Sequence, residues 1–239
     1  MTRNIIFGAV TALVLAPTAV SAADLAVKAP PPVAIYDWTG FYLGAAGGIS
    51  IGNSDHINRA TGLSDALGYN IHGGLAGGTL GYNWQMSNVV VGFEGDGSWT
   101  NERGSRLDIG PSGDRISTSF TKETWFATAR GRVGYAVNNL LFYATGGYAA
   151  AGVQATVKDG TSGLVASATS TRSGWTAGGG LEWGFTPNWS AKFELLYMSF
   201  NTAAFNTVLA EGPRNVPLND TVARAGINYR FGGPVVAKY

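Results

Sequence analysis

Eight segments of alternating apolar and polar residues, joined by connections that are in turn long and short, most constrain what this chain folds into. The segments are 39–52, 71–84, 89–99, 121–136, 140–153, 173–186, 190–201 and 221–231. Most have the length of a tilted membrane-spanning β-strand, about 9 to 11 residues or slightly more. Alternating short turns and long loops are typical of outer-membrane barrels. We predict an all-β fold: an eight-stranded antiparallel transmembrane β-barrel with short periplasmic turns and four long extracellular loops.

The N-terminus carries the features of an export signal. Arg3 precedes a short apolar run that ends in small residues, which predicts a cleaved signal peptide over 1–22 rather than a retained anchor. We expect a Pro-rich periplasmic segment over 23–38, the barrel over 39–231 and a C-terminal extension over 232–239. The chain has 16 Lys and Arg against 15 Asp and Glu. Without Arg3 it is formally neutral, so nothing indicates a nucleic-acid partner.

Two carboxylates, Glu94 and Asp96, interrupt the apolar segment 89–99. Since side chains alternate across a strand, they share one face while Val91 and Phe93 occupy the other. The same division holds in the other segments, so we predict a lipid-facing exterior and a charged interior. Such charges are acceptable in a low-dielectric interior only when they are paired. The predicted interior network is Glu94, Asp96, Arg130, Arg132, Glu182, Lys192, Glu194, Arg224 and Arg230.

Aromatic residues cluster at both ends of the segments, as in the two interfacial belts of a bilayer-spanning barrel. A soluble barrel or sandwich, the alternative, would place aromatics in its core and charges on its surface. The predicted girdle is Tyr82, Trp84, Trp99, Trp125, Tyr135, Trp175, Trp183, Trp189, Tyr229 and Phe231.

Several motifs resemble one known family. They are YDWTGFYLG, GYNWQ, GRVGYA, LFYATGG and the ending RAGINYRFGGPVVAKY, and they are similar to the small outer-membrane immunogenic proteins of alphaproteobacteria, the porin-family barrels related to the OmpA-like transmembrane barrel. The resemblance implies an abundant surface antigen of the outer membrane, associated with envelope integrity and recognised by hosts; a few relatives are described as haem-binding. The chain departs from the usual barrel ending, since GGPVVAKY follows Phe231.

Catalytic or cofactor chemistry has little support in the sequence. The chain has two histidines, His56 and His72, which motivate a haem hypothesis because imidazole is a common iron ligand; the alternative is that both are solvated. A triad with Ser54 or Ser64 is easily drawn but arises by chance in polar loops. We expect no enzyme, no resident cofactor and no metal site.

We therefore predict a structural barrel of the bacterial outer membrane, with a charge-filled interior and no large pore. The alternatives are a narrow porin for small solutes or ions and a haem-binding surface receptor. Expected partners are outer-membrane lipid, lipopolysaccharide and the barrel-assembly machinery, with peptidoglycan or a host surface as further contacts. Basic residues near the long connections, Arg103, Lys122 and Arg172 among them, suit lipopolysaccharide phosphates.

Overall fold

The computed structural model describes residues 36–54, 57–58, 69–109, 116–160, 162–163, 165–205 and 214–232. The predicted signal peptide, most of the predicted 23–38 segment and most of the 232–239 extension lie outside these ranges. Among the residues described, no helix is long and apolar enough to cross a membrane.

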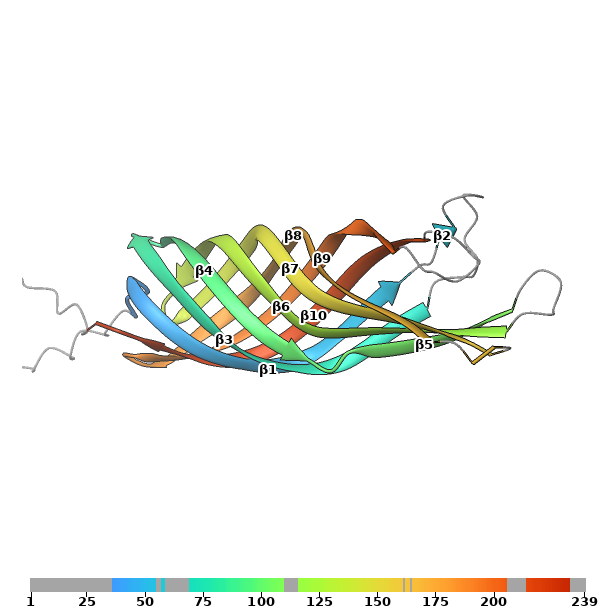
Figure 1. Ribbon diagram of the computed structural model, residues 1–239. Coiled ribbons are helices and arrows are strands. Elements are labelled where there is room, and N and C mark those ends of the chain that lie inside the picture. The colour runs from blue at the N-terminus through green and yellow to red at the C-terminus, as the bar shows by residue number, and fades with distance from the viewer. Residues whose placement is uncertain are drawn as a thin grey trace, which may run out of the picture. The chain divides into compact units, whose positions relative to one another are not determined.

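The described chain forms antiparallel β-strands that close on themselves (Figure 1). Their bounds are β1 Gly40–Ser54, β2 Ile57–Asn58, β3 Tyr69–Met86, β4 Val89–Thr100, β5 Arg103–Ile109, β6 Ile116–Val137, β7 Leu140–Asp159, β8 Val165–Thr186, β9 Trp189–Phe205 and β10 Arg214–Arg230. The order is β1-β10-β9-β8-β7-β6-β4-β3, and β1 also pairs with β3. Eight strands therefore close the ring, while β5 continues β4 and β2 is a short strand against β10. The predicted barrel is confirmed.

The strands extend further than the alternation predicted at the end where the connections are long. β7 runs to Asp159 and β8 begins at Val165, so the long loop expected over 155–172 shrinks to residues 160–164. The ladder continues because Thr and Val, which recur in these extensions, are good strand formers even where neither face is apolar. Figure 1 shows β5, β6, β7 and β8 continuing past the ring at this end.

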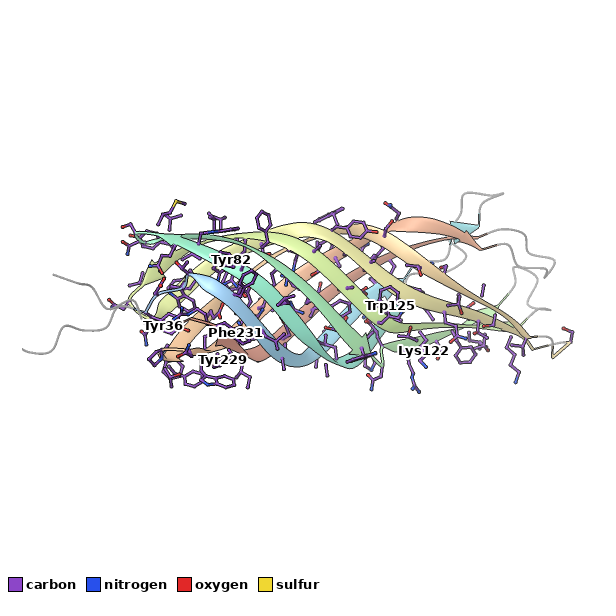
Figure 2. The ribbon with its side chains drawn as sticks, turned by 60° about the vertical axis from the view of Figure 1, so that its left-hand side comes forward. Tyr36, Tyr82, Lys122, Trp125, Tyr229 and Phe231 are labelled. Atoms are coloured by element: carbon purple, nitrogen blue, oxygen red, sulfur yellow. The ribbon has the colours of Figure 1, made fainter. Side chains whose placement is uncertain are left out.

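The exterior carries an apolar band of membrane thickness. On β6, Trp125 and Tyr135 both face outward and are ten residues apart, which is about 33 Å along a strand and about 25 Å across the band at a tilt of about 40°. Figure 2 shows Tyr82, Tyr229 and Phe231 near the short-turn end, Trp125 nearer the opposite end, and Lys122 beyond Trp125.

The interior contains apolar layers on both sides of the charged residues. The cluster at the short-turn end contains Tyr36, Trp38, Val90, Ala136, Leu141 and Tyr143. The cluster toward the other end contains Ile71, Leu75, Phe126, Ala149, Ala151, Val153, Leu196, Met198, Phe200, Leu218 and Val222. Neither layer was predicted. The β7 members of both belong to the segment LLFYATGGYAAAGV, which is apolar on both faces, so alternation alone does not orient it.

Candidate functional site

The nine residues assigned to the interior network all lie buried inside the ring. Five strands supply them: β4 holds Glu94 and Asp96, β6 Arg130 and Arg132, β8 Glu182, β9 Lys192 and Glu194, and β10 Arg224 and Arg230. Glu94 pairs with Arg130 in the β4–β6 register, and Arg224 with Glu194 in the β10–β9 register. Neighbouring strands thus present opposite charges at the same height.

Two arginines bridge three carboxylates across the lumen. Arg130 contacts Asp96 at 2.8 Å and Glu194 at 2.9 Å, and it also pairs with Glu94. Arg224 contacts Asp96 at 2.9 Å and Glu194 at 2.6 Å. Charge-assisted contacts of this length are among the stronger polar interactions in proteins. They connect strands that are not neighbours in the ring, because β3 and β1 lie between β4, which holds Asp96, and β10, which holds Arg224.

A second part of the network lies around Glu94 and Glu182. Lys192 Nζ lies 2.9 Å from Glu94, and Arg132 lies 2.9 Å from Glu182 and 3.5 Å from Glu94. The Tyr42 hydroxyl donates to Glu94 at 2.8 Å. A Cβ at position 81 would come 2.3 Å from that hydroxyl, so Gly81 provides the space in which the tyrosine ring lies.

The paired charges balance. The ion-paired groups are Glu94, Asp96, Glu182 and Glu194 against Arg130, Arg132, Lys192 and Arg224. Arg230 lies apart from them and donates to the carbonyl oxygens of Thr39 at 3.0 Å and Pro187 at 2.7 Å. Removing one member would leave a buried charge without compensation, at a cost of about 3 to 5 kcal/mol.

Residues just before β1 close the short-turn end of the interior. Trp38 is 2% exposed and its ring centroid lies 4.4 Å from that of Tyr36. Burial raises the pKa of the Tyr36 hydroxyl, so the phenol stays neutral at physiological pH. Arg230 lies over the Tyr36 ring, 5.6 Å from its centroid. The last residues of the segment predicted as a periplasmic linker therefore form part of the barrel core.

One of the two residues of the haem hypothesis lies within the described ranges. His72 is exposed on β3, opposite Ile51 and Arg103. His56 lies outside the described residues.

The predicted basic loop residues separate into two groups. Arg103 and Lys122 face each other across β5 and β6 and line an outer hollow of about 330 Å³ with Phe120, Gln154 and Thr156. Arg172, which was predicted to lie in a loop, is instead buried inside the ring, because β8 extends further than expected.

The ten girdle residues all lie on the outer side of the ring, and only Tyr82 is half-buried. Aromatic contacts link several of them: the centroids of Trp189 and Tyr229, and those of Tyr229 and Phe231, are each 5.1 Å apart.

A second buried group of charges was missed in the sequence. Glu102, Glu123 and Asp220 lie inside the ring beyond the charge network, toward the long-connection end. Arg172 interacts electrostatically with Asp220 and Glu123. No simple pattern reveals this group, because Glu123 falls on the exterior face when the alternation of Arg130 and Arg132 is extended outward.

Known proteins share this architecture. The family model of the outer membrane protein beta-barrel domain matches residues 11–231. The 31 kDa outer-membrane immunogenic protein of Brucella melitensis is 32% identical, over 96% of this chain and 100% of that protein. The 22 kDa outer membrane protein of Rhizobium leguminosarum is 31% identical, over 81% of this chain and 78% of that protein. The crystal structure of the outer membrane protease OmpT from Escherichia coli superposes with a TM-score of 0.51 at 9% identity, over 80% of this chain and 97% of that chain, which indicates a shared fold alone.

Proposed function

This chain belongs to the outer membrane protein beta-barrel family and is an outer-membrane protein, and on that premise we propose that it is a structural barrel with a closed interior. It would contribute to envelope integrity and present its outward loops to a host or ligand. The relative from Brucella melitensis is named an outer-membrane immunogenic protein, which supports a role as a surface antigen rather than as an enzyme.

The observation that carries this proposal is the ion-paired network across the lumen. An eight-stranded barrel has an interior just wide enough for side chains to fill, whereas barrels of 16 to 18 strands leave an aqueous channel. Here Arg130 and Arg224 span the lumen between carboxylates of β4 and β9. The apolar layers on either side of these charges would hinder a continuous column of water. A narrow porin is the alternative.

Single-channel recording in planar bilayers tests the closed interior. We expect no steady conductance from the purified, heat-modifiable barrel. The double variant Glu94→Ala with Arg130→Ala should conduct, because it removes one acid and one base from the centre of the network. Phe93→Ala is the matched control, since Phe93 neighbours Glu94 on β4 but faces outward. A steady ohmic current from the unmodified protein would favour the porin alternative.

Contact with lipopolysaccharide is a second role, favoured by the outer hollow at Arg103 and Lys122. Like charges that face each other across strands are destabilising unless an anion lies between them. A lipid A phosphate would fit this requirement just beyond the belt residue Trp125. We expect Arg103→Ser with Lys122→Ser to weaken lipid A binding in calorimetric titrations without lowering the unfolding midpoint of the lipid-free protein. Unchanged binding would contradict this role.

A further inference from the structure

Three carboxylates converge inside the barrel, away from the charge network. Glu102 lies between β4 and β5, Glu123 lies on β6 and Asp220 lies on β10. Their exposed fractions are 0%, 1% and 1%, respectively. One carboxylate oxygen from each lies within 4.8 Å of the others. We call these three residues the acidic triad.

A β-bulge is the reason that Glu123 belongs to the triad. Along β6, Ser119, Thr121 and Glu123 are buried, but further along the strand the buried positions are Thr128 and Arg130, so the alternation shifts by one residue. The β6–β7 register shifts between Glu123 and Trp125. A bulge inserts one extra residue and turns the following side chains to the other face. Without it, Glu123 would face outward.

The triad oxygens lack the hydrogen bonds that buried carboxylates normally accept. Both oxygens of Glu102, Glu123 and Asp220 are buried, and none accepts a hydrogen bond of good geometry from a described residue. The nearest polar groups are Ser50 and the Gly52 backbone for Glu102, while Glu123 and Asp220 lie beside each other. Leaving a buried acceptor unsatisfied costs about 1 to 3 kcal/mol, and more for a charged group. A bound cation would satisfy these oxygens.

A fourth oxygen also points to a ligand. Ser50 on β1 is 1% exposed, and its hydroxyl lies beside the Glu102 carboxylate without forming a hydrogen bond of good geometry to a described residue. Gly52 lies beside it. A Cβ at position 52 would come 2.0 Å from Asp220 Oδ1 and 2.7 Å from Glu102 Oε1. Glycine thus allows these carboxylates to approach the β1 backbone.

The charge of the cluster favours a divalent cation. Three carboxylates and the Arg172 guanidinium, which interacts with Asp220 and Glu123, carry a net charge of −2 when ionised. One divalent ion neutralises that charge. The protein groups beside Glu102 do not neutralise it, because they are the uncharged Ser50 hydroxyl and Gly52 backbone and the like-charged Asp220.

The ligand set and its burial select the metal. Oxygen-only ligands suit Ca²⁺ and Mg²⁺, whereas Zn²⁺ sites usually contain His or Cys. Three carboxylate oxygens that all lie within 4.8 Å of one another can share one ion. Mg²⁺ gives up its water ligands reluctantly and is seldom held by protein groups alone, whereas Ca²⁺ accepts several carboxylates in a flexible geometry, so a buried site of this kind favours Ca²⁺. We propose that Glu102, Glu123 and Asp220, with the Ser50 hydroxyl, form a calcium-binding site that ties β1, β6 and β10 together at the outward end of the barrel.

Calcium titration of the whole mature protein tests this proposal. The protein is refolded in detergent without lipopolysaccharide, which itself binds divalent ions, and is treated with a chelator. Calorimetry with CaCl₂ should give a dissociation constant of about 10⁻⁴ to 10⁻³ M, the range of extracellular calcium modules, and weaker binding of MgCl₂. In 10 mM CaCl₂ the barrel should unfold at a higher temperature, measured as the temperature at which heating changes its electrophoretic mobility.

Two isosteric variants, Asp220→Asn and Glu102→Gln, should each weaken calcium binding at least tenfold. The matched control is Asp37→Asn, which makes the same change at the opposite end and should bind calcium normally. In chelator, Asp220→Asn should be at least as stable as the unmodified protein, because a repelling charge has been removed.

Three results would overturn the site: no heat and no thermal shift from the unmodified protein, normal calcium affinity in both variants, or equal destabilisation of Asp220→Asn with and without calcium. None of these results depends on channel conductance, so the calcium site and the closed interior can fail separately.

Discussion

Replacing Arg132 by methionine is expected to destabilise the barrel by about 3 to 5 kcal/mol, because the change leaves a buried carboxylate without its ion-pair partner. Arg132 lies 2.9 Å from Glu182, and the two side chains are 1% and 4% exposed. The other donors to Glu182 are the neutral groups of Ser190 and Asn228. A Coulomb energy of about 4 kcal/mol at 4 Å and an effective dielectric constant of about 20 agrees with this range. Arg132 also lies 4.1 Å from the Tyr143 ring centroid, and loss of that contact adds to the cost.

A double-mutant cycle separates the free-energy cost of the unpaired charge from the cost of the lost packing. Glu182→Gln keeps the shape and the acceptor oxygen of the side chain while removing its charge. The double variant should therefore be more stable than Arg132→Met alone, with a coupling energy of about 2 to 3 kcal/mol. Urea unfolding in detergent or liposomes, followed by tryptophan fluorescence, measures all four proteins.

A cost below about 1 kcal/mol for Arg132→Met would refute the reasoning, since exposed ion pairs contribute no more than that. It would mean that water reaches Glu182 and that the interior is hydrated. The coupling energy would then be close to zero as well.

The remaining predictions concern packing. Trp38→Ala should lower stability by about 3 to 5 kcal/mol in urea unfolding, because a fully buried indole is lost from the short-turn end; a change below 1 kcal/mol would show that this segment does not pack inside in solution. Gly81→Ala should cost about 1 to 3 kcal/mol, since its Cβ meets the Tyr42 hydroxyl. The control is Gly97→Ala, whose Cβ would have nothing within 4 Å, and its stability should stay within about 0.5 kcal/mol of the unmodified protein. Equal urea midpoints for the two glycine variants would contradict the predicted clash with Tyr42.

Most of the barrel could be predicted from the sequence because apolar and polar residues alternate along the strands with a period of two. Lipid outside and paired charges inside require opposite residue types on successive positions, so Glu94 and Phe93 assign the faces of β4 without any tertiary information. The short turns then fix the order of neighbouring strands. Both kinds of information are local, and local patterns are what a sequence displays directly.

Contacts across the lumen could not be predicted in this way. Alternation assigns Arg224 and Asp96 to the interior, but only ring closure and strand stagger bring them within 2.9 Å of each other. The sequence predicts Trp38 within a linker, because nothing in the Pro-rich segment indicates that its end turns into the barrel.

The sequence by itself determined the fold class, the outward faces of the strands and the residue types of the interior, because these follow from side-chain periodicity in a membrane. Only the tertiary structure decided the members of the acidic triad. The bulge between Glu123 and Trp125 reverses the alternation of β6. A bulge depends on how two strands pair rather than on the composition of either, so the face of Glu123 is a property of the closed ring.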